Sequence, residues 1–184
     1  MLLTLLVALG ILIAVIVVIV GIGYALPTQH TATHSRSIHQ PITAVWAVIT
    51  DYQNTSVWRK DVHAVVQLPN RNGHEVWKEM DRRGRGIPYE TVTEQEPYSI
   101  VRQICDEKLP FGGSWHIKLT SKGSNTEVTI TENGEVRNPI FRFVSRFIMG
   151  HSRSILQYLD ALAAYMEPPP TDAPAISRNS PDAL

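Results

Sequence analysis

Residues 127–166 read EVTITENGEVRNPIFRFVSRFIMGHSRSILQYLDALAAYM, and the spacing of the apolar side chains changes within this segment. Up to Val136 apolar and polar residues alternate, which is the pattern of a β-strand that buries one face. Asn138-Pro139 then supplies a helix cap and a proline at the first helical position. Beyond it the apolar residues recur at helical spacing, at Ile140, Phe143, Val144, Phe147, Ile148, Ile155, Leu156, Leu159, Leu162 and Met166. The pattern predicts a strand followed by one long helix over 139–166, with Gly150 as the place for a bend.

A series of strand-like segments precedes residue 127, and turn signals separate them, among them Gly84-Arg85-Gly86 and the segment PFGG at 110–113. The segments cover residues 31–38, 62–68, 74–81, 88–96, 98–106 and 114–120. Two short helical segments, one after Pro41 and one at Val57-Trp58, stand between the first two strands. The short connections imply an antiparallel meander.

This order of elements predicts the α+β class, with a curved antiparallel sheet of about seven strands wrapped on the long C-terminal helix. An antiparallel sheet commonly buries one of its faces. Here only helix 139–166 is large enough to cover that face. We expect a strongly curved sheet that holds a single helix to leave a cavity between the two.

The N-terminal segment Leu2–Gly23 contains no charged side chain. As a helix it would span roughly 33 Å, which matches the hydrocarbon core of a bilayer. We predict one transmembrane helix that anchors the chain. A cleaved signal peptide is the alternative, because Gly23-Tyr24-Ala25 resembles a cleavage site, but no Lys or Arg precedes the apolar run. Arg36 is the nearest basic residue after the span, which favours a single-pass protein with its domain on the cytoplasmic side.

Three parts of the chain follow from composition: an anchor at 1–26, one domain at 27–166, and a proline-rich tail at 167–184 that is predicted to be disordered. Lys/Arg and Asp/Glu are balanced at 17 each, so binding of nucleic acid is not indicated. The single Cys105 excludes an internal disulfide. Nothing in the sequence defines an oligomeric state.

Three short segments carry a resemblance to a known family: IHQPI at 38–42, LPFGGSW at 109–115, and TENGEVRNP at 131–139 running into Phe141-Arg142-Phe143. With Met149-Gly150-His151 and Tyr158-Leu159, they resemble the SRPBCC superfamily over roughly residues 31–166. This superfamily has the helix-grip fold of START lipid-transfer domains, birch-pollen-allergen-like proteins and bacterial polyketide cyclase/dehydrase-like proteins. The resemblance implies that fold and a cavity for a lipid or other hydrophobic small molecule. It supplies no shared catalytic motif and no cofactor, so the site must be argued from the residues.

Strand alternation places two charged side chains on the buried face of the sheet. Glu132 shares a face with Val128 and Ile130, and Arg102 shares one with Ile100 and Ile104. The strand between them offers Trp115, Ile117 and Leu119. The alternation thus allows an Arg102–Glu132 pair across Ile117, unless a bulge turns one of the two side chains outward. It is either a structural ion pair or a polar anchor for the head of an apolar ligand.

The other candidate cavity residues are Tyr89, Trp115, Ile117 and Ile130. Tyr89 is either a hydroxyl at the cavity rim or a packing residue. Tryptophans 46, 77 and 115 are expected in the core or the cavity wall, and Trp58 at an entrance.

No metal site is expected, because the seven histidines show neither HExxH nor paired His/Cys spacing, and His151 is read as structural. Arg142, Arg146 and Arg153 fall near one stripe of the predicted helix, and Arg82, Arg83 and Arg85 cluster in a loop. These groups are either solvated or directed at anionic lipid headgroups.

Three functions remain open. The first is a membrane-anchored module that binds a hydrophobic molecule. The second is a cyclase- or dehydratase-like enzyme that uses Glu132 or Tyr89 as acid or base. The third is an interaction module with a filled core. The size of the cavity distinguishes the first two from the third.

Overall fold

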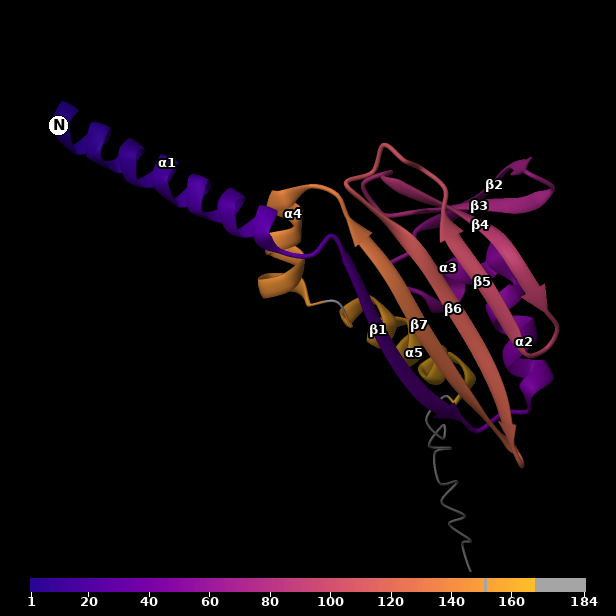
Figure 1. Ribbon diagram of the computed structural model, residues 1–184. Coiled ribbons are helices and arrows are strands. Elements are labelled where there is room, and N and C mark those ends of the chain that lie inside the picture. Colours follow the sequence, from indigo (N-terminus) through magenta and orange to yellow (C-terminus); the bar gives the residue numbers. More distant parts are fainter. Residues whose placement is uncertain (151, 168–184) are drawn as a thin grey trace, which may run out of the picture.

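The computed structural model describes residues 1–150 and 152–167 (Figure 1). The strands are β1 (Gln29–Ile38), β2 (Ala64–Arg71), β3 (His74–Met80), β4 (Gly86–Gln95), β5 (Ser99–Ile104), β6 (Phe111–Lys122) and β7 (Asn125–Val136). The helical elements are α1 (Leu2–Ala25), α2 (Ile42–Thr50), η1 (Tyr52–Asn54), α3 (Thr55–Trp58), α4 (Pro139–Val144), η2 (Ser145–Met149) and α5 (Arg153–Met166). The predicted α+β class is confirmed.

The strands form one seven-stranded antiparallel sheet in the order β1-β7-β6-β5-β4-β3-β2. Strands β2 to β7 are a meander, as expected, and β1 pairs with β7 along its whole length, from Gln29 opposite Glu135 to Ile38 opposite Thr126. On the solvent face of this pair, hydroxyl groups bond across the strands, Thr33 to Thr131 at 3.0 Å and Ser35 to Thr129 at 2.8 Å. Polar residues that alternate along β1 thus face water, while Ile38 is fully buried.

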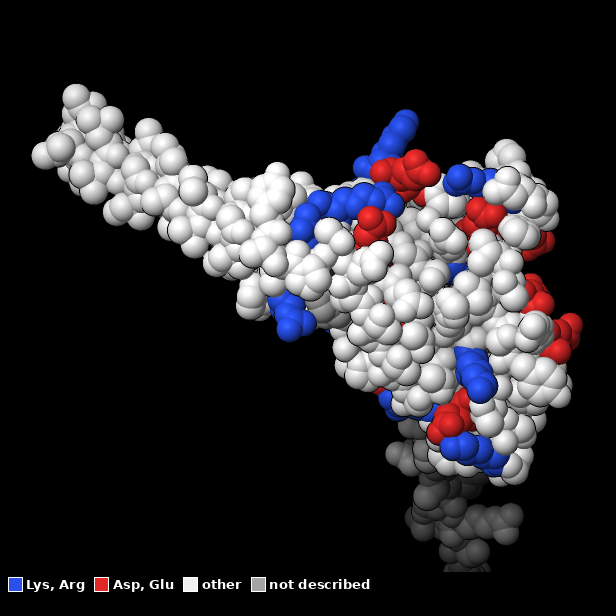
Figure 2. Space-filling model, in the orientation of Figure 1, with Lys and Arg blue, Asp and Glu red and all other residues white. Residues whose placement is uncertain are grey.

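Helix α1 projects from the domain and buries almost none of its surface (Figure 1). It is the one helix among the described residues that is long and apolar enough to cross a membrane, and Figure 2 shows no charged group along it. Its last turn packs on α4. Gly23 is buried there, and a Cβ atom on it would lie 2.0 Å from the carbonyl oxygen of Pro139. The side chain of Arg142 donates to the carbonyl oxygen of Leu26 at 3.0 Å.

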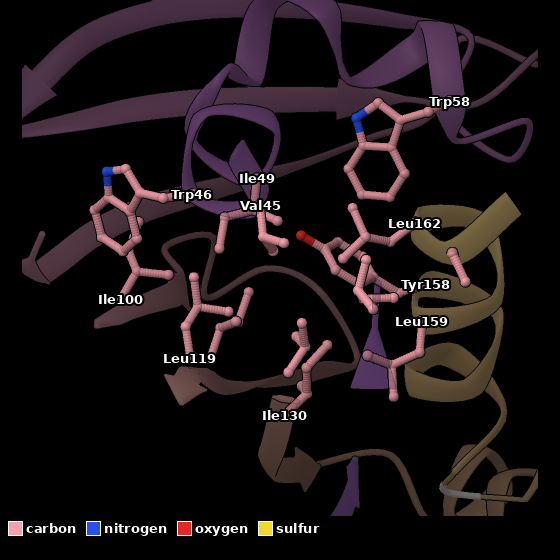
Figure 3. Close-up of a cluster of buried hydrophobic side chains, with 14 of the residues drawn as sticks. Val45, Trp46, Ile49, Trp58, Ile100, Leu119, Ile130, Tyr158, Leu159 and Leu162 are labelled. Atoms are coloured by element: carbon pink, nitrogen blue, oxygen red, sulfur yellow. The ribbon is translucent and has the colours of Figure 1, made fainter. Parts of the chain in front are cut away.

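The sheet therefore has an anchor end, where β1 begins and β7 ends beside α1, and a far end at the β6–β7 hairpin (Figure 1). The hydrophobic core fills the far half, where α2, α3 and α5 cover the concave face (Figure 3). Fully buried side chains come from both layers, and they include Ile38, Val45, Leu119, Val128, Ile130, Ile155 and Leu162. Burial of this cluster is the main source of stability for the fold.

The helix predicted over 139–166 is not continuous, and it breaks at Gly150, the residue predicted as the place for a bend. The segment forms α4, a wider π-helical turn η2, and then α5, and Gly150 ends η2 with φ at +73°. A backbone in this left-handed region cannot continue a right-handed helix, and glycine adopts it without a steric penalty. Of the two α-helices in this segment, α5 covers the sheet, whereas α4 packs against α1.

A second correction concerns segment 110–113, which was predicted as a turn. Phe111, Gly112 and Gly113 belong to β6, because β7 continues to Val136 and Phe111 pairs with it. Gly113 has φ at +126°, and a Cβ atom there would lie 2.2 Å from the carbonyl oxygen of Asn133. The glycine allows β6 and β7 to stay paired at the anchor end.

The predicted disordered tail, 167–184, lies outside the described residues except for Glu167. The carboxylate of Glu167 accepts hydrogen bonds from the backbone and the ring of His39, the ring at 2.8 Å. These contacts join the end of α5 to the end of β1.

Candidate functional site

A cavity of about 320 Å³ occupies the concave side of the sheet at its anchor end, beyond the part that α5 covers. Strands β4, β5, β6 and β7 form its floor, and α4, η2 and Gly150 form part of its rim. The surface of the cavity is mostly apolar and includes a few polar side chains. The lining residues are His30, Ile87, Tyr89, Arg102, Ile104, Phe111, Gly112, Gly113, Ser114, Trp115, Glu132, Glu135, Val136, Phe141, Ser145, Gly150 and Ser154.

Arg102 is the buried cation of this cavity. Its Nη1 donates to Glu79 Oε1 at 2.8 Å, and its guanidinium lies 4.3 Å from the ring centre of Tyr52 and 4.8 Å from that of Tyr89. The two rings hold the guanidinium plane by cation–π contact. Its Nε and Nη2 atoms are buried and have no hydrogen-bond partner among the residues that the structure describes. Buried donors of this kind are costly, so an acceptor supplied by a ligand would be favoured there.

Glu79 joins Arg102 to a second arginine. Its other oxygen accepts from Arg59 Nη1 at 2.7 Å, and its side chain is only 7% exposed. Burial by itself raises the pKa of Glu79, but Arg102 and Arg59 outweigh burial and hold the pKa below its ordinary value. One carboxylate thus serves two guanidinium groups, and the three together carry a net positive charge beside the cavity. Arg59 shares part of its charge with the exposed Asp61 at 2.6 Å.

The Arg102–Glu132 pair that the alternation allows does not form, and the reason lies in the residue between them. Arg102 stands opposite Trp115, and Trp115 stands opposite Glu132. The indole fills the space between the two charges, and its Nε1 donates to Glu132 Oε2 at 2.8 Å. Arg102 therefore turns the other way, towards Glu79 on β3.

Glu132 is held by groups from three elements. Besides Trp115 on β6, it accepts from Ser154 Oγ on α5 at 3.1 Å, and it lies 3.1 Å from His30 Nε2 on β1. Gly134 makes room for the imidazole, since a Cβ atom on it would lie 2.2 Å from His30 Cε1. The result is a half-buried His–Glu pair in the wall of the cavity.

Residues 29–167 match the family model described as polyketide cyclase/dehydrase and lipid transport. The chain belongs to this family.

Solved structures agree with the helix-grip fold of the family. A START superfamily protein from Mycobacterium smegmatis superimposes with a TM-score of 0.60 at 12% identity, over 75% of this chain and 97% of its own. The Zhui aromatase/cyclase from a Streptomyces species gives 0.59 at 13% identity, over 76% and 94%. Norcoclaurine synthase from Thalictrum flavum gives 0.58 at 9% identity, over 74% and 86%. At these identities the similarity concerns the fold alone. Among curated protein sequences, none matches the chain.

The structure places four of the six candidate cavity residues in the wall of this cavity: Tyr89, Arg102, Trp115 and Glu132. Ile117 and Ile130 do not line it. Each lies two residues closer to the far end of the sheet than Trp115 or Glu132 on the same strand, and both are buried in the core. Tyr89 stacks on Arg102, and burial raises the pKa of its hydroxyl. It therefore stays protonated and is a hydrogen-bond donor rather than a base.

Two further expectations are corrected. Trp58 is a core residue that packs edge-on against Tyr158 at 5.0 Å and does not line an entrance. Arg142 is buried at the junction of α1 and α4 and bonds to backbone carbonyl oxygens, so it does not belong to an exposed basic stripe. Arg146 and Arg153 are exposed. His151 lies outside the described residues.

Sequence reasoning missed Glu79 and His30. Glu79 shares a face with Trp77, and His30 shares one with Ala32, so strict alternation from either neighbour would have placed both inward. Both strands are rich in polar residues, which hid the pattern. Among the described residues, no group of three His, Cys, Asp or Glu side chains is placed to hold a metal ion.

Proposed function

We propose that this chain is a membrane-anchored binding protein, and that its cavity holds a lipid or another hydrophobic molecule whose polar head accepts hydrogen bonds from Arg102. The observation that carries the proposal is the combination of an apolar cavity with buried, unpartnered guanidinium donors in its wall, as far as the described residues go. The family description, which includes lipid transport, supports it.

The size and lining of the cavity favour a small ligand over a filled core. About 320 Å³ is at the lower end of the range for small-molecule sites, and such sites combine apolar walls with a few placed polar groups. Phe111, Phe141, Val136 and Ile104 provide the apolar surface here. These features speak against a pure interaction module.

The charge of the Arg59–Glu79–Arg102 group favours a carboxylate or carbonyl head. Glu79 is shared with Arg59 and binds only Nη1 of Arg102, so an acceptor beside Arg102 Nη2 would meet a donor of a charged guanidinium. Arg102 is held by contacts with two tyrosine rings, so little side-chain freedom is lost on binding.

The anchor belongs to the same proposal. Residues 1–26 would hold domain 27–166 at the membrane that supplies the ligand, with the domain on the cytoplasmic side. The length and composition of α1 support a membrane span. Its packing on α4 ties the domain to the anchor.

A titration tests the role of Arg102 directly. The detergent-solubilised full chain is titrated with an anthroyloxy-labelled fatty acid, and binding is measured by fluorescence. Arg102→Met should lower the affinity, because it removes the donors while Arg59 still neutralises Glu79. Arg82→Met, at an exposed loop position, is the matched control. Equal affinities for the two variants would refute the role given to Arg102.

An acid–base enzyme of the cyclase or dehydratase kind is the second candidate, and the His30–Glu132 pair favours it. A carboxylate beside an imidazole in the wall of an apolar cavity can move a proton to or from a bound substrate. Glu132→Gln keeps the shape of the side chain and removes its charge. If the protein is an enzyme, this variant should bind the same co-purifying compound as the wild type but should not convert it. Conversion by the wild type is detected as a decrease of the bound compound's mass by one water molecule. Conversion that continues unchanged would exclude Glu132 as acid or base.

A further inference from the structure

The segment from α4 to Gly150 has two apolar sides with different surroundings. Phe141, Ser145 and Gly150 line the cavity. On the other side Ile140, Phe147 and Ile148 are 46%, 60% and 69% exposed, and Phe143 packs against Phe147 at 5.0 Å. Exposed large apolar side chains that cluster on one short segment mark a contact surface.

The position of this segment identifies what covers it. Its first residue touches Gly23, in the last turn of α1, and Arg142 binds the carbonyl oxygen of Leu26, just after α1 ends. A helix of 24 residues is about 36 Å long, whereas the hydrocarbon core of a bilayer is about 30 Å thick. The last turn of a membrane-spanning α1 therefore reaches the headgroup layer, and the segment packed on it lies at the same depth.

The basic side chains near this segment agree with its placement in the headgroup layer. Arg146 is exposed on the same segment, and Arg137 is exposed immediately before it. Figure 2 shows uncharged α1 followed by Lys or Arg side chains where it meets the domain. Apolar residues next to basic ones are the composition of helices that lie in the headgroup–acyl boundary.

A second pocket, of about 300 Å³, lies at the junction of α1 and α4, next to the cavity. It is lined by Leu26, Pro27, Arg142 and Arg146 at the base of the anchor. Three of its residues, His30, Val136 and Ser145, also line the main cavity. The two hollows are thus separated by little more than these three side chains, and the second one lies where the chain leaves the proposed span.

We infer that residues 139–150 insert into the headgroup–acyl boundary of the membrane that holds α1 and form the gate through which the cavity takes up its ligand from the bilayer. The π-helical turn η2 and the left-handed Gly150 make this segment the part of the cavity rim that can move. The inference rests on the proposed anchor and ligand cavity, and it adds the route by which the ligand enters the cavity.

Spin-label depth measurements test the contact with the bilayer. In a Cys105→Ser background, a nitroxide is placed at Phe147→Cys or Ile148→Cys, and the full chain is reconstituted in phosphatidylcholine/phosphatidylglycerol vesicles. Controls are Tyr98→Cys, exposed near the far end, and Ile11→Cys on α1. The ratio of collisions with oxygen to collisions with a water-soluble nickel complex should be high at 11, 147 and 148 and low at 98.

Two adverse results have different meanings. A high ratio at 11 with water-like ratios at 147 and 148 would overturn the gate while leaving the anchor intact. A water-like ratio at 11 would overturn the anchor in the proposed function, and the gate with it.

The route has its own test. The double variant Phe147→Ser/Ile148→Ser should take up the anthroyloxy-labelled fatty acid from vesicles more slowly than the wild type, with unchanged affinity at equilibrium in detergent. Tyr98→Ser is the control for loss of an exposed apolar side chain. Uptake rates equal to the wild type would show that the ligand does not enter through this segment.

Discussion

Glu79 carries the negative charge between Arg59 and Arg102, and its ionisation links the stability of the fold to pH. Its pKa in the folded protein lies below the ordinary value of 4.5. A lowered pKa adds stability at pH values above 4.5, and this contribution is lost as the pH falls through the folded value. Acid should therefore destabilise the domain by protonating Glu79.

Replacement of Glu79 by Gln should remove this contribution at neutral pH, because it takes the carboxylate partner from the buried Arg102 and leaves Arg59 with Asp61 alone. Loss of one partner from a buried ion pair costs about 3–5 kcal/mol. Thermal melting of the full chain in detergent measures the effect. The melting temperature of Glu79→Gln should be low at neutral pH and should fall less in acid than that of the wild type. The exposed Glu94→Gln is the control, and equal melting curves for the two variants would contradict the charge arrangement.

For single residues, the sequence predicted the face of the sheet to which a side chain points better than it predicted the residue that the side chain binds. Alternation placed Arg102 and Glu132 inward, and both line the cavity. It did not predict that Trp115 would separate them and bind Glu132, or that Arg102 would bind Glu79. Partners depend on side-chain size and on strand order across the sheet, and a residue pattern within one strand contains neither.

The elements differ in how well local pattern determines them. The seven strands were predicted to within a few residues, because each alternates over its own length. The C-terminal helix was predicted less well: Gly150 was named as the place for a bend, but the helical spacing of apolar residues continues through it and did not indicate a full break. Its break is a tertiary effect: α4 packs on α1 and α5 packs on the sheet, and one straight helix cannot do both.

The pairing of strand β6 with β7 also depends on a tertiary contact, the close approach of the two strands at Gly113. Gly113→Ala should destabilise the domain, because its positive φ costs about 1–3 kcal/mol for a residue with a side chain and its Cβ would meet the backbone of Asn133. Gly112→Ala should cost much less, since the nearest atom is the movable end of the Arg137 side chain, at 2.9 Å. Thermal melting compares the two, and similar losses would contradict the close approach of β6 and β7.

For the whole molecule, the junction of α1 and α4 sets the orientation of the domain relative to α1. Gly23→Ala should separate the two helices, because the new methyl group would overlap the carbonyl group of Pro139. Gly21→Ala has open space around it and is the matched control. Pulsed electron resonance between labels at positions 11 and 98 should give a broader distance distribution for Gly23→Ala only. Indistinguishable distributions would mean that α1 is not docked.

The central claim is that the cavity at the anchor end holds an amphipathic molecule, and native mass spectrometry of the full chain released from membranes in mild detergent tests it most directly. The account predicts wild-type protein with one bound hydrophobic molecule, and a smaller bound fraction for Arg102→Lys, which keeps the charge but loses the Nε and Nη2 donors. Wild-type protein that carries no bound molecule, and still carries none after incubation with fatty acids, would contradict the account.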